Sequence, residues 1–202
     1  MQVIECEQYS HAWWTARRGL PTASEFHNLI TPKTGKPAAA AETYINRLIA
    51  DTLSMEYPNK DEFESFAMKR GSRIEPQARK WLEFDQNIKT RLVGLCISDD
   101  GRFGCSPDAL VGDDDGLELK CPLPATQVGW LREGILPPEH LAQVHGSMIV
   151  TGRRKWTWAA FCPGLPPLLI RVQRDEYTEK LERALEEFHA KYKSVLEEVK
   201  SM

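Results

Sequence analysis

The chain contains the stretch SPDALVGDDDGLELKC at residues 106–121, in which two short alternating runs flank a turn rich in Asp and Gly. This pattern predicts a β-hairpin with a longer loop. Because side chains alternate along a strand, Glu118 and Lys120 share one face of the second arm. With the turn centred near Asp114, we expect Asp108 roughly opposite Lys120 and diagonal to Glu118. Two carboxylates and one ammonium then converge on one patch.

An oxygen-rich patch of this kind suits a hard cation, because Mg²⁺ takes oxygen ligands and usually needs only one or two protein carboxylates. Two bare carboxylates 4 Å apart would repel by about 4 kcal/mol at an effective dielectric near 20, so a metal or a lysine relieves strain. The Glu-x-Lys pattern alone is not specific, since it recurs at Glu198 and Lys200 on a charged helix. The strand setting and the preceding Pro107 and Asp108 distinguish the first copy. A solvated, charge-rich hairpin is the alternative interpretation.

Size and composition favour one globular domain spanning residues 1–202. The chain has 202 residues, 42% of them hydrophobic and 27% charged, which is enough apolar material for a real core. The formal net charge of −3 does not indicate a general nucleic-acid binder. Any contact with DNA would therefore come from local basic patches.

The cysteines and the amino terminus indicate a cytoplasmic protein. The five cysteines are odd in number, scattered and without a Cys-x-x-Cys pair, which argues against a disulfide framework, a zinc site or an iron–sulfur cluster. The first residues lack the basic and apolar regions of a signal peptide, and no apolar run approaches membrane-spanning length. We expect no membrane contact.

A possible anion site lies near the amino terminus. Thr22 followed by Glu25 forms a capping-box pattern, which predicts a helix beginning at Thr22. Three apolar side chains of this helix are expected to be buried: Phe26, Leu29 and Ile30. A helix start attracts phosphate, and Ser24 in the first turn with Arg17 just before it would close a fork on the anion. The alternative is a well-capped helix beside a surface arginine.

The rest of the chain alternates between helical and strand patterns. Helices are predicted at residues 38–53, 61–84, around 128–131, from 137 onward and at 175–200. Strands are predicted at residues 91–98, 155–162 and 168–172. Glu75 borders the buried stripe of the helix at 61–84, and Gln143 lies beside the apolar face of the helix that starts at 137. Strands interrupted by helices indicate a mixed α/β fold with the hairpin central to the sheet.

Four stretches in order carry a family resemblance: RRGLPTASE at 17–25, RGSRIE at 70–75, CSPD at 105–108 with LELKCP at 117–122, and AQV at 142–144 with SM at 147–148. Together they resemble the phage lambda-type exonucleases, also called alkaline exonucleases or YqaJ-type viral recombinases, of the PD-(D/E)XK nuclease superfamily. The resemblance spans nearly the whole chain. One short motif would be weak, but four in the right order and spacing are specific.

The resemblance implies a restriction-endonuclease-like fold, with a central mixed β-sheet flanked by α-helices. It implies a Mg²⁺-dependent exonuclease, using two ions with Mn²⁺ as a substitute, that degrades one strand of linear duplex DNA from its 5′ end. Mononucleotides are released and a 3′ single strand remains for a single-strand annealing protein. Such enzymes form homotrimeric rings, and the setting would be a phage or prophage protein in the bacterial cytoplasm.

The resemblance also assigns roles at the hairpin. Asp108 and Glu118 would be metal ligands, joined by the main-chain carbonyl of Leu119. Lys120 would orient or deprotonate the attacking water. Gln143 would help to hold Lys120 and the scissile phosphate.

Outside the hairpin, the resemblance places Glu75 beside the metals and makes Arg17 and Ser24 the pocket for the terminal 5′ phosphate. Basic side chains available for DNA are Lys33, Lys36, Lys69, Arg70, Arg73, Arg153, Arg154 and Lys155. Two alternatives stay open. One is an endonuclease or repair nuclease of the same superfamily, which would not need the 5′-phosphate pocket. The other is a non-catalytic module that binds DNA ends.

Overall fold

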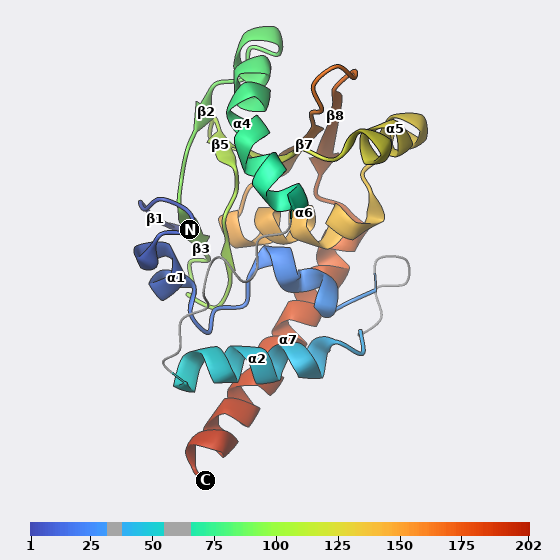
Figure 1. Cartoon of the computed structure of the whole chain (residues 1–202). Helices are drawn as coiled ribbons and strands as arrows, with labels where there is room; N and C mark the ends of the chain where they lie inside the picture. The colour runs from blue at the N-terminus through green and yellow to red at the C-terminus, as the bar shows by residue number, and fades with distance from the viewer. Residues whose placement is uncertain (32–37, 55–65) are drawn as a thin grey trace.

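The computed structural model describes residues 1–31, 38–54 and 66–202, and it centres on a mixed five-stranded sheet (Figure 1). The strand order is β2-β5-β6-β7-β8, with β6 and β7 parallel and the other pairs antiparallel. The strands are β2 (Thr90–Arg91), β5 (Ala109–Val111), β6 (Asp115–Lys120), β7 (Lys155–Ala160) and β8 (Leu168–Gln173). The predicted α/β fold with a central mixed sheet is confirmed, and the β5–β6 hairpin lies within that sheet.

A second, smaller antiparallel sheet is formed by β1 (Gln2–Ile4), β3 (Leu95–Ile97) and β4 (Gly104–Cys105). The single strand predicted at residues 91–98 is wrong, because β2 pairs with β5 while β3 pairs with β1. The chain changes sheets between them, beside Gly94. A Cβ atom at Gly94 would lie 2.4 Å from the Cys6 carbonyl oxygen, so only glycine fits this crossing.

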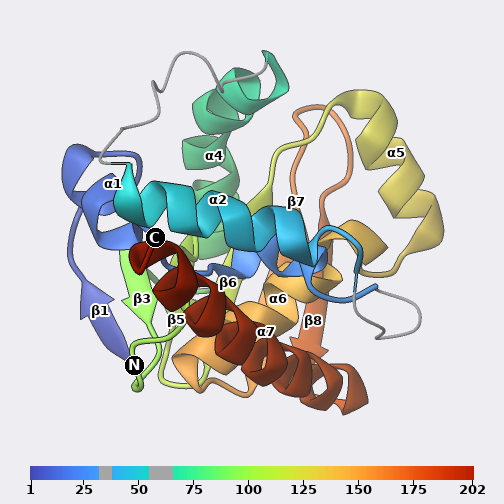
Figure 2. The ribbon, with the colours of Figure 1, turned by 90° about the horizontal axis from the view of Figure 1, so that it is seen from below.

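Helices cover both faces of the large sheet. They are α1 (His11–Arg17), the 3₁₀ helix η1 (Ala23–Asn28), α2 (Ala41–Leu53), α4 (Phe66–Asp85), α5 (Pro124–Glu133), α6 (Pro138–Thr151) and α7 (Glu176–Lys200). On one face, Ala78 and Leu82 of α4 pack with Leu117 and Leu119 of β6. On the other, α6 packs against the buried tryptophans of β7. Seen from below, α2 and α7 cross in front of α6 (Figure 2).

This layering gives each strand of the hairpin two different faces. The apolar residues of β6 point toward α4, so the side chains between them, Glu118 and Lys120, point toward α6. The helix predicted at residues 61–84 is α4 from Phe66 onward, and its predicted first residues lie outside the described part of the chain. Within the described residues, no helix is both long and apolar enough to cross a bilayer.

The turn of the hairpin is centred one residue earlier than predicted, which shifts the pairing of its two strands by two residues. Ala109 faces Leu117 and Val111 faces Asp115, so the turn is centred at residue 113 rather than at Asp114. Asp108 therefore does not lie opposite Lys120. Arg153 accounts for the tighter turn, because its Nη1 donates to the carbonyl oxygens of Val111 (3.2 Å), Gly112 (2.8 Å) and Asp115 (2.7 Å). Arg153 lies outside the hairpin in the sequence, so the alternating pattern of the hairpin residues could not predict its effect on the turn.

Candidate active site

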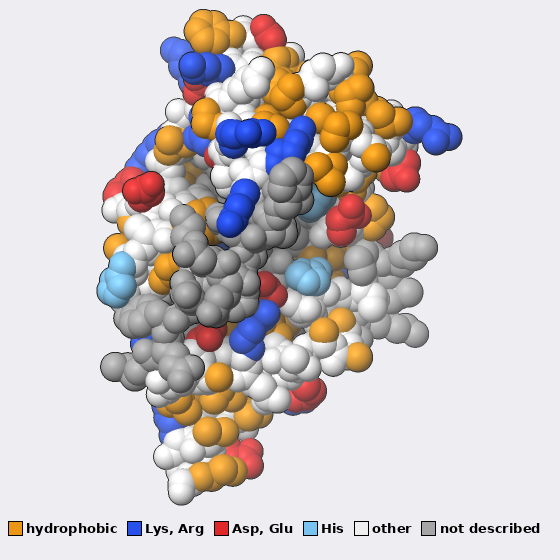
Figure 3. Space-filling model, in the orientation of Figure 1, with side chains coloured by type: hydrophobic (Ala, Val, Ile, Leu, Met, Phe, Trp, Pro, Cys, Tyr) orange, Lys and Arg blue, Asp and Glu red, His pale blue; other side chains and the backbone are white. Residues whose placement is uncertain are grey.

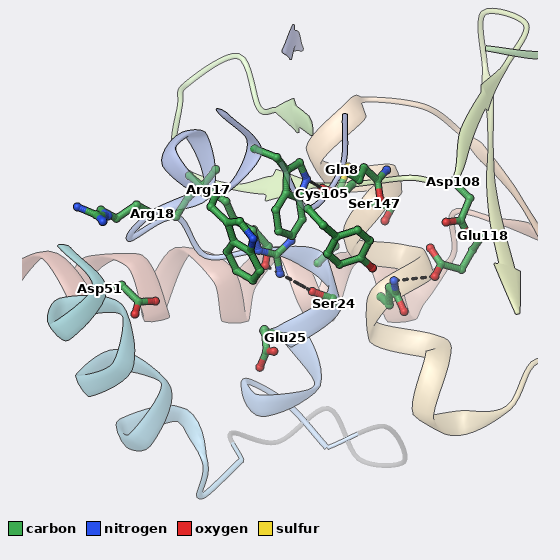
Figure 4. A pocket seen from close by; sticks show the side chains of 18 of the residues that line it. Gln8, Arg17, Arg18, Ser24, Glu25, Asp51, Cys105, Asp108, Glu118 and Ser147 are labelled. Carbon is green, nitrogen blue, oxygen red and sulfur yellow. Dashed lines mark hydrogen bonds between the residues drawn. The ribbon is translucent and has the colours of Figure 1, made fainter. Parts of the chain in front are cut away.

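A cavity of about 760 Å³ is lined by the amino-terminal segment, η1, α4, the hairpin and α6. Figure 4 shows Asp108 and Glu118 on one side of it and Arg17 and Ser24 on the other. The structure thus brings residues far apart in the chain to one site. We call the side with Asp108 and Glu118 the carboxylate end, and the side with Arg17 and Ser24 the fork end.

At the carboxylate end, three of the predicted residues form a closed hydrogen-bonded cluster. The side chain of Glu118 is only 5% exposed, and its Oε1 accepts from Lys120 Nζ at 2.5 Å. The same oxygen accepts from Gln143 Nε2 at 2.8 Å. Lys120 Nζ also donates to Gln143 Oε1 at 3.4 Å. β6 supplies the ion pair and α6 supplies the amide, so the contact between sheet and helix fixes the geometry.

Asp108 sits against the same cluster through the main chain of β6. Its Oδ2 accepts from the Leu119 amide at 2.5 Å. Burial, followed by the nearby charge of Glu118, raises the pKa of Asp108 well above its usual range, and Lys120 counters this only in part. Burial disfavours the ammonium of Lys120, but Glu118 and Asp108 outweigh it and raise the pKa of Lys120. The buried carboxylate of Glu118 and the half-buried carboxylate of Asp108 therefore share one cation.

The donor set at this end fits a hard divalent cation. Within the described residues, no three Asp, Glu, His or Cys side chains gather as a metal-binding group, so a metal here would depend on Asp108, Glu118 and a main-chain carbonyl. The amide and carbonyl of one strand residue point to the same side, and the Leu119 amide points at Asp108. The Leu119 carbonyl therefore faces the same region. Two carboxylates and a carbonyl suit Mg²⁺, which keeps waters in its other positions.

Glu75 also reaches the cavity, from α4. Its carboxylate forms an ion pair with Arg79, one helical turn further along. It lies close enough to Asp108 that its charge contributes to the raised pKa of that group. The structure thus brings Glu75 to the edge of the carboxylate end, where its charge is paired with Arg79.

The fork end is built from Arg17 and Ser24, which are joined by a hydrogen bond of 2.9 Å from Arg17 Nη2 to Ser24 Oγ. The guanidinium also lies 4.8 Å from the ring centre of Trp13, and burial lowers the pKa of Arg17. A permanent cation and an exposed hydroxyl at one point suit a phosphate or another anion.

The α-helix predicted to begin at Thr22 is wrong in type. The segment is the short 3₁₀ helix η1, and the Thr22 side chain makes no capping hydrogen bond. Thr22 is held extended, because its amide donates to the Tyr44 hydroxyl at 3.0 Å. Glu25 binds Asn28 and Arg47 instead of completing a capping box. The burial of three apolar residues in this segment is confirmed: Phe26, Leu29 and Ile30. The fork therefore depends on the arginine and the hydroxyl rather than on a helix dipole.

Several residues of the cavity wall were not predicted from the sequence. Tyr9, Trp13, Ser106 and Ser147 line it between or beside the two ends. Ser106 immediately precedes the Pro-Asp of the hairpin, and Trp13 belongs to an unusual pair of adjacent tryptophans. Both residues could therefore have been singled out from the sequence. Nothing in the sequence marks Tyr9.

The predicted basic residues divide into two groups. Arg70 donates to the carbonyls of residues 121 and 122, Arg153 clamps the hairpin turn, and Arg154 pairs with Asp114. The exposed side chains are those of Lys69, Arg73, Lys155 and, despite its ion pair, Arg154. Lys and Arg side chains gather over α4 above the cavity (Figure 3). Lys33 and Lys36 lie outside the described residues.

Comparisons with known proteins bear on the family and the fold of the chain. The YqaJ-like viral recombinase domain matches residues 12–154. An alkaline exonuclease, LHK-Exo of Laribacter hongkongensis, is similar with 28% identity and a TM-score of 0.84, over 95% of this chain and 97% of that chain. Its complex with dAMP gives a TM-score of 0.83 over the same shares. A phage-related exonuclease of Haemophilus somnus 129PT shares the fold, with 14% identity and a TM-score of 0.68 over 89% and 96% of the chains. No curated protein matches the chain.

Proposed function

Because this chain belongs to the YqaJ-like viral recombinase domain family, we propose that it is a Mg²⁺-dependent 5′→3′ exodeoxyribonuclease. Its substrate would be linear double-stranded DNA with a 5′ phosphate. Its products would be mononucleotides and a 3′ single strand. The observation that carries this proposal is one cavity with an Asp–Glu–Lys cluster around the buried Glu118 at one end and an arginine–serine fork at the other.

The carboxylate end supplies the chemistry of phosphodiester hydrolysis. Asp108, Glu118 and the Leu119 carbonyl would hold Mg²⁺, with a second ion expected on the side of Glu75 and with Mn²⁺ as a substitute. When bound, Mg²⁺ supplies an activated water and neutralises charge on the phosphate.

Lys120 would orient the attacking water as an ammonium, or take its proton as a neutral amine. Its Nζ lies 2.5 Å from Glu118 Oε1 and is held from the other side by Gln143. The amide of Gln143 would also contact the scissile phosphate.

The fork end supplies the preference for DNA ends. A terminal 5′ phosphate carries more charge than an internal phosphodiester and has more free oxygens. Arg17 and Ser24 would bind it at a fixed distance from the carboxylates, so that the first phosphodiester reaches the reacting groups. LHK-Exo has been solved in complex with dAMP, a deoxynucleoside monophosphate, which supports the release of single nucleotides.

Processive degradation would depend on assembly. A chain with a net charge of −3 has little broad attraction for DNA, so we propose a homotrimeric ring that encloses the duplex. The exposed basic residues of α4, Lys69 and Arg73, are the candidates for contact with the backbone of the entering duplex. The remaining 3′ strand would pass to a single-strand annealing protein.

The proposal is tested with linear and covalently closed circular duplexes of the same sequence, incubated with the protein and Mg²⁺ or with EDTA. We expect the linear duplex alone to be degraded, and only with Mg²⁺. Cutting of the closed circle would instead indicate an endonuclease. Binding of linear ends without any cleavage would indicate a non-catalytic end-binding module.

A further inference from the structure

Tyr9 is held in place by anchors on both sides in the sequence. The Gln8 side chain donates to the Pro107 carbonyl at 2.9 Å. The Trp13 indole donates to Ser106 Oγ at 2.8 Å. Both partners belong to the segment that leads directly to Asp108, the residue before β5. The main chain around Tyr9 is therefore fixed relative to the carboxylate end.

The backbone of Tyr9 is strained. Its φ is +66°, in the left-handed region, where a side chain with a Cβ is unfavourable. Among the described residues, Asn87 is the other non-glycine with positive φ, and Asn adopts this conformation far more readily than Tyr. Strain of this kind concentrates at functional sites and persists where the surroundings impose it. A glycine at position 9 would adopt this backbone conformation without strain. The presence of a tyrosine there therefore points to a function of its ring.

The ring of Tyr9 is presented to the cavity. The residue is 49% exposed, whereas Trp13 and Tyr44, two other aromatic residues of the wall, are buried. Its ring centre lies 5.2 Å from that of Trp13, which in turn lies under the Arg17 guanidinium. Burial and then the charges of Asp108 and Glu75 raise the pKa of Tyr9, and Arg17 acts on it with the opposite sign. The phenol therefore lies close enough to both ends of the cavity for the charges at each end to act on it.

A nucleotide cut from a 5′ end must occupy this space. If the fork holds the terminal phosphate and the carboxylates act on the next phosphodiester, the sugar and base of the first nucleotide lie between them. We propose that the Tyr9 ring stacks on the base of the 5′-terminal nucleotide and is a specificity-determining residue for the first cut. This inference rests on the proposed exonuclease function. Stacking tolerates any base, since every base has a π-face.

The test removes the Tyr9 ring from the protein and the 5′-terminal base from the DNA in separate experiments. Two 5′-phosphorylated linear duplexes are compared in single-turnover assays of the first cut, one with a normal 5′-terminal nucleotide and one with an abasic tetrahydrofuran residue there. For the unchanged protein we expect the abasic end to be cut about tenfold more slowly, within the range that base–aromatic stacking supports. Tyr9→Gly should cut the normal end about tenfold more slowly and lose the discrimination between the two ends. Tyr9→Asn, which also accepts the left-handed backbone, should behave in the same way.

Two controls separate the ring from the hydroxyl and the backbone. Tyr9→Phe should keep the discrimination, and Asn87→Gly, which relieves positive φ away from the cavity, should change nothing. Full discrimination in both Tyr9→Gly and Tyr9→Asn would overturn the inference, as would equal losses in Tyr9→Phe and Tyr9→Gly. An unchanged protein that cuts both ends equally fast would overturn the inference alone. One that cuts neither end would overturn the proposed function with it.

Discussion

The two ends of the cavity are built in different ways. At the carboxylate end, Glu118 and Lys120 stand on a central strand and are joined to Gln143 by hydrogen bonds in a nearly closed cluster. At the fork end, Arg17 closes a seven-residue helix and Ser24 belongs to a six-residue 3₁₀ helix, with one hydrogen bond between them. One end is built around the buried Glu118 where a sheet packs on a helix, and the other is assembled from short segments near the surface.

This difference fits two separate tasks, hydrolysis at the carboxylate end and recognition of the DNA end at the fork end. Phosphodiester hydrolysis needs reacting groups held at fixed positions, which a sheet packed on a helix provides. Recognition of a DNA end needs an accessible anion site, which short exposed segments provide at little structural cost. Changes at the carboxylate end should therefore abolish turnover on every substrate, whereas changes at the fork end should affect only substrates with a 5′ phosphate.

The largest effect is expected for Lys120→Ala. Removal of the ammonium should lower the cleavage rate about a thousandfold, within the range of a positioned acid–base group. Binding of 5′-phosphorylated duplex, measured by fluorescence anisotropy in EDTA, should persist because the fork is intact. Lys200→Ala is the control, since Lys200 belongs to the other Glu-x-Lys pattern, on α7. Turnover that survives in folded Lys120→Ala would contradict the role of Lys120.

A smaller and more selective effect is expected for Arg17→Ala. The loss of a charge-assisted contact should slow digestion of 5′-phosphorylated linear duplex about ten- to a hundredfold. Digestion of the 5′-hydroxyl duplex should keep its rate, because that substrate never gains the contact. Arg132→Ala, an exposed arginine on α5, serves as the control. Equal losses on the two substrates would count against a phosphate pocket at the fork end.

The contribution of Arg153 to the hairpin at the carboxylate end can be measured as a change in the free energy of unfolding. Arg153→Ala leaves three hairpin carbonyls without their cationic donor, so the free energy of unfolding in urea should fall by about 2–4 kcal/mol. The neighbouring Arg154 pairs with Asp114 but is 77% exposed, so Arg154→Ala should lower the free energy of unfolding far less than Arg153→Ala does. Similar losses in both variants would mean that Arg153 does not clamp the hairpin.

The smallest effect is expected at His140, one turn before Gln143 on α6. Burial, with a contribution from Lys120, lowers the pKa of His140 to about 3. The unfolded chain binds this proton near pH 6.5 and the folded chain does not, so stability falls as pH drops below that value. This group should account for about 1 kcal/mol of the loss between pH 7.5 and 5.5. His140→Phe should reduce the acid sensitivity of thermal unfolding, whereas His27→Phe, at an exposed position, should not. An unchanged pH dependence in His140→Phe would contradict this account.

The sequence predicts the carboxylate end better than the fork end, for physical reasons. Alternation along β6 correctly puts Glu118 and Lys120 on one face, and helical periodicity puts Gln143 on a helix that can meet them. The predicted pairing of the two strands was wrong by two residues because Arg153, far along the chain, sets the turn. Such a clamp leaves no trace in the local pattern.

At the fork end, local pattern was misleading. The capping box at Thr22 did not form, because a hydrogen bond to Tyr44 holds that residue extended. The nearness of Arg17 to the carboxylates follows from tertiary packing, and before the structure only family resemblance indicated it. The positive φ of Tyr9 is likewise a product of its anchors rather than of its own preference.

The central claim is that one cavity binds the 5′ phosphate at one end and cuts at the other. It is tested most directly by the first product released from linear duplexes with a radioactive label on either the 5′ phosphate or the 3′ terminus, in Mg²⁺. We expect the 5′ label to appear at once as a mononucleotide, while the 3′ label stays on a long strand. Early release of the 3′ label, or a 5′-labelled oligonucleotide as the first product, would contradict it.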